Sequence, residues 1–201
     1  MPQFVPITQD VLIERLVERL RALPGHRVIA IDGADAARPV DLADRVAAAL
    51  RDTGRPANVV SLHDYVRPAS LRVEFGRDDI SYRTAWFDYD ALRREVIDAL
   101  HTDGRWLPAL WDEATDRSAR AAIRPAPADT VLLIAGPMLL DHYLQFDLTV
   151  RLDMSAQALR RTTPPEDHWT IPALVDNHEN NTTPTFFARW DHPDRPALRV
   201  D

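Results

Sequence analysis

Cysteine and lysine are both absent from this sequence, and all 24 of its basic residues are arginine. The absence of cysteine excludes disulfide bonds, thiolate nucleophiles and thiolate metal sites. The absence of lysine means that no side-chain ammonium group can neutralise a bound phosphate. Long apolar runs are missing too, since the longest, residues 131–140, is interrupted by Gly136 and Pro137 and is too short to cross a bilayer. We therefore expect no membrane partner and no membrane-spanning segment.

The bulk composition fits a single globular domain over residues 1–201. The chain is 45% hydrophobic and 27% charged, and its length allows one sizeable buried core. Its net charge of -7 and its dispersed arginines argue against nucleic acid as a partner. The first residues lack the charged and apolar pattern of a signal peptide, so we expect a cytoplasmic location.

One segment has the layout of a phosphate-binding strand, loop and helix. Residues 27–33 form an apolar stretch that ends in Gly33, and residues 39–50 have the spacing of an amphipathic helix. The loop between them, residues 33–40, reads GADAARPV, where a phosphate loop reads G-x-x-x-x-G-K-[ST]. Of these motif residues, only the first glycine is present.

The replaced positions of this loop remove three phosphate-binding features. Arg38 stands in place of the glycine that lets backbone N–H groups converge on phosphate, Pro39 in place of the lysine, and Val40 in place of the hydroxyl that holds magnesium. The segment is therefore either a well-capped helix without a ligand or a loop in which Arg38 grips a phosphate beside Gly33. Asp35 adds negative charge where an anionic ligand would lie.

The remaining pattern predicts alternating strands and helices, and hence a parallel sheet. Residues 1–25 contain an N-terminal helix, residues 63–87 form a long polar connection, and residues 162–194 form an irregular polar segment that resembles a lid. Helices are expected over residues 10–23, 39–50, 88–100, 139–144 and 156–161. Strands are expected over residues 27–33, 58–62, 130–135, 148–152 and 197–200, with a short edge strand near residues 106–111.

Six stretches, in this order, resemble the uridine kinase family of P-loop kinases over roughly residues 27–201. They are IDG at 31–33, VSLHDYVRP at 60–68, SY at 81–82 with FDYDAL at 87–92, WD at 111–112 with DR at 116–117, LLIAGPML at 132–139, and ALRR at 158–161. The resemblance implies a three-layer α/β/α fold with a mostly parallel central sheet and uridine kinase-like topology. It implies ATP and magnesium as cofactors only if kinase activity is retained.

The resemblance also gives roles to individual positions, and several of these are changed. The position of the family's candidate base holds His63, with Asp64 one place later, and Ala135 replaces the acidic residue of the Walker B-like strand. Arg160 and Arg161 match the helix that leads into the phosphate-gripping lid, but threonine and proline follow where the family has further arginines. Phosphoryl transfer relies on positioning and charge neutralisation, so these changes predict a degenerate kinase.

The remaining polar side chains still allow a site. His63, Asp64 and Asp32 follow predicted parallel strands at their carboxyl ends, where open α/β sheets bind ligands, and they could act as catalytic acids or bases. Alternatively, His63 caps the strand and Asp64 binds backbone in a turn. Arg67, Arg72, Tyr82 and the retained Asp112 are the substrate-binding candidates, although the arginines could instead pair with nearby acids and Tyr82 could pack on the core. No residues have metal-ligand spacing, so no metal site is predicted.

Three functions are consistent with these observations. The favoured hypothesis is a degenerate uridine kinase-like protein that lacks standard ATP–magnesium phosphotransfer and acts as a binding or regulatory protein, through a small-molecule ligand or a homodimer. The first alternative is an active nucleoside or small-molecule kinase in which Arg38, Arg160 and Arg161 supply the positive charge. The second is a non-kinase enzyme that uses the same pocket for acid–base chemistry on a metabolite.

Overall fold

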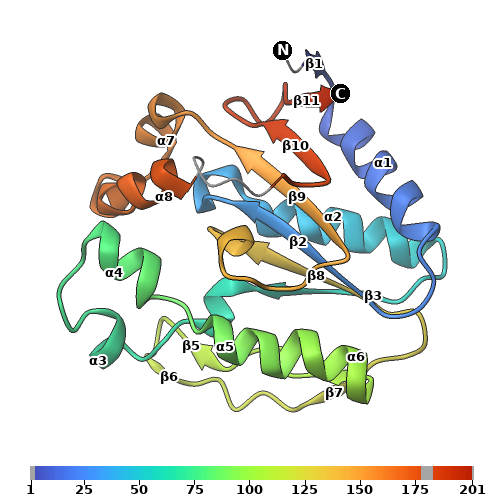
Figure 1. The fold of residues 1–201 in the computed structure, drawn as a ribbon, viewed down its shortest axis with the longest axis horizontal. Helices are drawn as coiled ribbons and strands as arrows, with labels where there is room; N and C mark the ends of the chain where they lie inside the picture. The colour runs from blue at the N-terminus through green and yellow to red at the C-terminus, as the bar shows by residue number, and fades with distance from the viewer. Residues whose placement is uncertain (1–2, 178–182, 201) are drawn as a thin grey trace.

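A seven-stranded sheet forms the centre of the protein (Figure 1). The computed structural model describes residues 3–177 and 183–200. The strand order is β1-β11-β10-β9-β2-β8-β3. The strands are β1 (Gln3–Pro6), β2 (Arg27–Gly33), β3 (Ala57–Ser61), β8 (Val131–Gly136), β9 (Leu148–Asp153), β10 (Phe186–Arg189) and β11 (Ala197–Val200).

Five neighbouring strands of this sheet are parallel. β2 pairs with β8 on one side and β9 on the other, β3 extends the parallel sheet beyond β8, and β10 extends it beyond β9. β11 and β1 add antiparallel pairings at the far edge. All six residues of β8 are buried, as expected for a parallel strand covered on both faces. The α/β fold class with a mostly parallel sheet is therefore confirmed.

Helices follow the strands in the expected α/β pattern. They are α1 (Gln9–Arg21), α2 (Pro39–Asp52), α3 (Ala69–Arg72), α4 (Asp79–Thr84), α5 (Tyr89–Leu92), α6 (Ala99–Asp103), α7 (Ala156–Thr162) and α8 (Ile171–Asn177). A π-helical stretch, Arg93–Asp98, joins α5 to α6 in one continuous helix. In Figure 1 the parallel strands point toward the side where α4, α7 and α8 gather.

Local sequence explains where the two longest helices begin. The Thr8 hydroxyl accepts a hydrogen bond from the Val11 N–H and caps α1. Pro39 occupies the first turn of α2, where a missing N–H costs nothing, and Asp41 in that turn favours the helix dipole. α2 then buries Leu42, Val46 and other apolar residues against the sheet. The predicted helices over residues 10–23 and 39–50 correspond to α1 and α2 within two residues at each end.

Two regions are more regular than the sequence indicated. Residues 63–87 contain α3 and α4, and residues 162–194 contain a 3-10 segment (Pro165–Thr170), α8 and β10, apart from residues 178–182, which lie outside the described residues. β1 precedes the N-terminal helix. These elements are short and lack a full apolar period, so their regularity depends on contacts with distant residues.

One predicted edge strand does not join the central sheet. Residues 106–111 instead contribute to two separate two-stranded pairs, in which β4 (Arg105–Trp106) pairs with β7 (Arg124–Pro125) and β5 (Trp111–Asp112) with β6 (Arg117–Ser118). Strands of two residues carry too little pattern to reveal their partners. The predicted helix at 139–144 is a single 3-10 turn, Leu139–Asp141.

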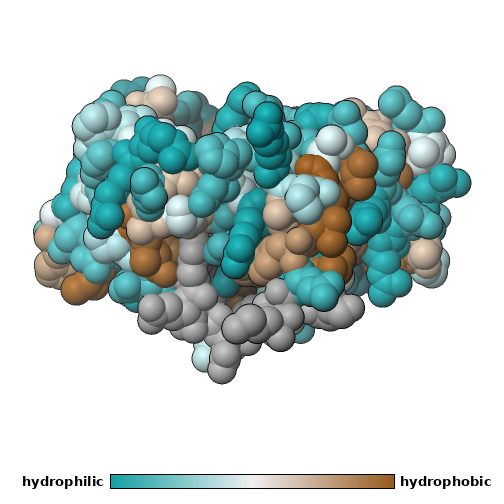
Figure 2. All heavy atoms as spheres, turned by 90° about the horizontal axis from the view of Figure 1, so that it is seen from above, coloured by the Kyte–Doolittle hydropathy of each residue, from teal (hydrophilic) through white to brown (hydrophobic). Residues whose placement is uncertain are grey.

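One face of the molecule carries mainly polar groups. Figure 2 shows hydrophilic side chains over most of this face, with separate groups of hydrophobic side chains among them. Among the described residues, no helix combines the length and apolar character needed to cross a bilayer.

Candidate functional site

A cavity of about 550 Å³ opens where β2 and β3 end. The segment that follows β2, the turn that follows β3, and the segment after α7 meet at this cavity. Carboxyl ends of parallel strands are where open α/β sheets bind ligands. Its wall consists of Ala34, Asp35, Ala36, Arg38, His63, Tyr82, Trp86, Glu113, Thr162, Thr163, Pro164, Asp167, Trp169, Thr170 and Leu174. A second cavity, of about 530 Å³, lies at the amino ends of the strands beside Pro56 and Asp129, so we regard the first as the candidate site.

The phosphate-loop segment, residues 33–40, folds into a closed 3-10 turn. The Ala37 N–H donates to the Ala34 carbonyl at 2.8 Å and the Arg38 N–H to the Asp35 carbonyl at 2.9 Å. Both groups are therefore used inside the turn instead of pointing toward a phosphate, and Pro39 has no N–H to offer. The Trp190 indole N–H donates to the Ala37 carbonyl at 2.9 Å within the core and fixes the turn from the other side.

Arg38 makes a local ion pair, and Gly33 packs closely against β9. Arg38 has φ of 56°, in the left-handed region that favours the glycine of a phosphate loop. Its guanidinium pairs with Asp41 one turn later, and 74% of the side chain is exposed. A Cβ on Gly33 would lie 2.9 Å from that of Leu152, so close packing against β9 requires glycine there.

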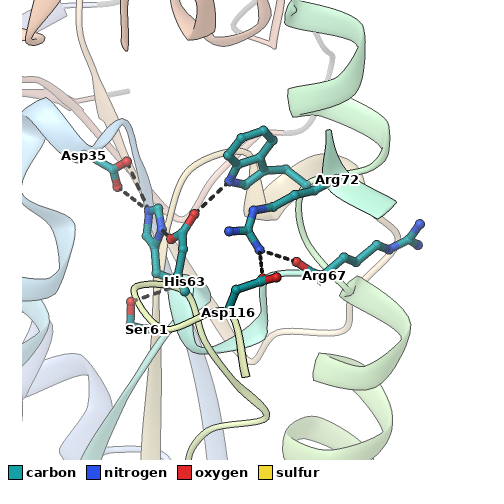
Figure 3. Close-up of polar contacts among 8 residues, drawn as sticks. Asp35, Ser61, His63, Arg67, Arg72 and Asp116 are labelled. Carbon is teal, nitrogen blue, oxygen red and sulfur yellow. Dashed lines mark hydrogen bonds and ion pairs between the residues drawn. The ribbon is translucent and has the colours of Figure 1, made fainter. Parts of the chain in front are cut away.

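His63 lies between two carboxylates at the floor of the cavity (Figure 3). Its Nδ1 is 2.7 Å from Oε2 of Glu113, and its Nε2 is 3.0 Å from Oδ1 of Asp35. Asp35 comes from the segment after β2, Glu113 from the β5–β6 hairpin, and His63 from the 3-10 turn Leu62–Tyr65 after β3. The imidazole therefore ties together three separate parts of the chain.

This contact keeps His63 in its charged form. Burial disfavours the imidazolium, but hydrogen bonds to Asp35 and Glu113 outweigh burial and raise the pKa of His63 to about 10. Burial likewise acts to raise the pKa of Glu113, while the hydrogen bond from His63 and its charge bring that pKa below the usual value. With both ring nitrogens bonded, His63 is a fixed cation near neutral pH and a poor proton acceptor.

Aromatic rings form the opposite wall. The Trp86 and Trp169 ring centroids are 4.8 Å apart, and those of Tyr82 and Trp169 are 5.4 Å apart. Trp86 also donates from Nε1 to Oε1 of Glu113 at 3.2 Å. Tyr82, a predicted substrate-binding residue, does line the cavity, although only 4% of it is exposed.

Asp32, predicted as a catalytic residue, is buried in the sheet and does not lie in the cavity wall. Its carboxylate accepts a hydrogen bond from the Leu139 N–H at 2.9 Å and from Nε of Arg151 at 3.0 Å, and both side chains are buried. Asp32 lies opposite Arg151 in the register of β2 and β9 and is not part of the cavity wall. It therefore belongs to a buried ion pair of the sheet.

Asp64 and Asp112 also lie outside the cavity wall. Burial raises the pKa of Asp64, against the effects of a backbone hydrogen bond at Ser61 and the charge of His63. The exposed Asp112 accepts a hydrogen bond from the Thr115 N–H at 3.1 Å in the β5–β6 hairpin, and backbone hydrogen bonding lowers its pKa. Among the predicted catalytic residues, the structure places only His63 at the cavity.

The predicted anion-binding arginines do not converge. Nη1 of Arg72 donates to the Arg67 carbonyl at 2.6 Å and to Asp116 at 3.0 Å, so the buried Arg72 supports the chain locally. Figure 3 shows the Arg67 side chain extending away from His63. Arg161 donates to the Asp191 carbonyl at 3.0 Å, and neither it nor Arg160 belongs to the cavity wall.

Comparison with solved structures identifies the architecture. A structure described as a possible uridine kinase from Bacillus stearothermophilus aligns with a TM-score of 0.65 at 20% identity, covering 86% of this chain and 97% of the other. A structure assigned as a fructose transport system kinase from Silicibacter sp. TM1040 aligns with a TM-score of 0.67 at 20% identity, covering 90% and 98%. The chain has a uridine kinase-like P-loop fold. No protein-family model and no curated protein matches the sequence.

Several residues of this segment differ from those with which a phosphate loop holds a magnesium nucleotide. The turn that should cradle phosphates is closed by its own hydrogen bonds, and the Asp35 carboxylate lies within it. Val40 and Ala135 carry no oxygen in their side chains for a metal ion. Among residues 3–177 and 183–200, no group of three or more histidine, aspartate or glutamate side chains is arranged to hold a metal.

Glu113, Asp167 and Trp169 are among the wall residues that were not sequence candidates for the site. Glu113 contacts His63 across 50 positions of sequence, and only its neighbour Asp112 matched a family motif. Asp167 and Trp169 lie in the segment expected to be irregular. Asp35 was the one indication in the sequence that this site is acidic, because it is an acidic residue in a loop with the layout of an anion-binding loop.

Proposed function

We propose that this protein is a small-molecule-binding protein built on a uridine kinase-like P-loop fold, and that it does not carry out standard ATP–magnesium phosphotransfer. The closed turn of residues 35–37 is the observation that carries the proposal. A phosphate loop stabilises transferred charge with converging N–H groups and a lysine. Here the Ala37 and Arg38 N–H groups bond within the turn, and the chain has no lysine.

The arrangement around His63 supports the same proposal. Asp35 presents a carboxylate in the phosphate-loop segment, and His63 neutralises part of its charge. An incoming phosphate would meet the negative charge of Asp35 and Glu113, and His63 is already bonded to both. The observed cavity nevertheless has the size and mixed polar and aromatic lining of a small-molecule site.

Neither alternative function gains comparable support. An active kinase would need Arg38, Arg160 and Arg161 to converge on phosphate, whereas Arg38 pairs with Asp41 and the other two lie off the cavity wall. Acid–base chemistry would need a proton acceptor near neutral pH, whereas the raised pKa of His63 keeps it protonated. The kinase alternative is the outcome that the test below would reveal.

The purified protein is expected to show no ATP turnover above buffer with a panel of nucleosides and sugars as phosphate acceptors, with magnesium present. The physical reason is the loss of charge neutralisation at the γ-phosphate. The measurement is release of ADP and formation of phosphorylated acceptor. ATP-dependent phosphorylation of any acceptor, abolished by Asp64→Ala and retained by the exposed control Asp176→Ala, would overturn the proposal.

A further inference from the structure

The cavity wall carries more negative than positive charge. Asp35, Glu113 and Asp167 contribute carboxylates, whereas His63 and Arg38 are the cations of the wall. Arg38 is paired with Asp41, which is not part of the wall, so its charge is already balanced. Of the wall's own cations, His63 alone is left to balance three carboxylates, and Arg72, which lies outside the wall over the Trp86 ring, adds its charge near Glu113.

Asp167 is the acid of this wall whose carboxylate has no cationic partner among the described residues. Within the described parts of the chain its carboxylate makes no ion pair and no side-chain hydrogen bond, while its backbone N–H donates to the Pro164 carbonyl and its carbonyl accepts from the Thr170 hydroxyl. Asp35 is half exposed, with 59% of its side chain accessible, so it too can meet a ligand from the cavity side. Both acids favour a positively charged ligand group over a negative one.

The aromatic residues of the cavity wall also suit a cationic ligand. Trp86, Trp169 and Tyr82 lie edge to face or tilted against one another. Indole rings attract cations through their faces and pack on apolar bodies through their area. Nε1 of Trp169 is buried and has no hydrogen-bond partner among the described residues, so the ring meets the cavity with its carbon atoms.

We propose that this cavity binds a small organic cation: an ammonium or guanidinium group held by Asp167 and Asp35, on an aromatic or apolar body that packs against Trp86 and Trp169. This inference rests on the proposed function, in that it assigns a ligand class to the same cavity. It excludes nucleotides and other anions, which the carboxylates repel.

Three probes of one shape and different charge test the ligand class. We would titrate the full-length protein with 2-phenylethylamine, 2-phenylethanol and phenylacetate at pH 7 and follow tryptophan fluorescence, because two indoles line the cavity. The amine is expected to bind about tenfold more tightly than the alcohol, and phenylacetate is expected not to bind. Equal affinity for amine and alcohol, or no binding of the amine, would overturn the inference.

A matched pair of variants locates the binding. Asp167→Asn is expected to weaken amine binding by about fivefold, whereas Glu166→Gln, a neighbouring exposed acid outside the wall, is expected to leave it unchanged. Equal effects of the two variants would overturn the assignment to this cavity.

A parallel titration with magnesium ATP distinguishes a wrong ligand class from a wrong proposed function. If neither the amine nor magnesium ATP binds, the cationic ligand class is wrong and the proposed function is not contradicted. If magnesium ATP binds and the amine does not, both the ligand class and the proposed function are wrong.

Discussion

Arg151→Met is expected to lower the free energy of unfolding by about 3–5 kcal/mol, because it leaves the Asp32 carboxylate buried without its cation. Arg151 contacts Asp32 at 3.0 Å, and only 4% and 3% of their side chains are exposed. Urea denaturation followed by far-UV circular dichroism would measure the change. An effect this large is expected only if Asp32 is held as an ion in the sheet.

Two controls separate this charge effect from loss of packing. Asp32→Asn combined with Arg151→Met removes both charges, and it should regain about 2 kcal/mol relative to Arg151→Met alone. Arg83→Met breaks a surface pair with Asp176, in which 39% and 58% of the side chains are exposed, and should cost under about 1 kcal/mol. If Arg151→Met cost no more than Arg83→Met, the buried pair would not have the structural role given to it.

The protein is expected to lose about 2 kcal/mol of stability between pH 6.5 and pH 10 through His63 alone. The folded pKa of His63, about 10, is above the unfolded value of 6.5. A raised pKa contributes stability that is complete below the unfolded pKa and is lost as pH rises through the folded one. The full shift would correspond to about 5 kcal/mol. Because 34% of the side chain is exposed, solvent screening reduces this to about 2 kcal/mol.

His63→Gln provides the comparison. At pH 7 it should be about 2 kcal/mol less stable than the native protein, because Asp35 and Glu113 then lie close together without a cation, and the difference should nearly vanish above pH 10. His192→Gln, an exposed histidine, should keep the native pH profile. A constant difference between the native protein and His63→Gln across this pH range would show that His63 is not held as an imidazolium.

At acid pH the stabilising contribution of Glu113 to this cluster is lost. The pKa of Glu113 is lowered, so its contribution is present above its unfolded value and is lost as pH falls through the folded one. The combined contribution of His63 and Glu113 is therefore largest between about pH 5 and pH 6.5.

The sequence predicted five of the seven strands of the central sheet, because these strands carry their own signal, whereas β1 and β10 were not predicted. β8 is a continuous apolar run that ends in glycine, and β2 has an apolar centre between Arg27 and Asp32. The order of elements then leaves few parallel topologies to consider. The short β4 to β7 strands and α8 had no such signal, since two to seven residues cannot express a full period.

The site was harder to predict because it depends on distant contacts. His63 was placed correctly, since the end of a parallel strand is a local property. Its partner Glu113 lies 50 positions away in a small hairpin, and no spacing rule connects the two. Asp32 lies at a strand end as predicted, but its pairing with Arg151 of β9 could not be predicted, because that contact depends on the order of strands in the sheet.

We propose that the phosphate-loop segment, residues 33–40, does not bind a magnesium nucleotide. Calorimetric titration of the native protein with ATP and with a non-hydrolysable analogue, each with and without magnesium, tests this proposal. We expect no saturable heat up to about 1 mM ligand, corresponding to a binding free energy weaker than about 4 kcal/mol. Magnesium-dependent binding in the micromolar range would contradict the account and would return Arg38 to the role of a phosphate ligand.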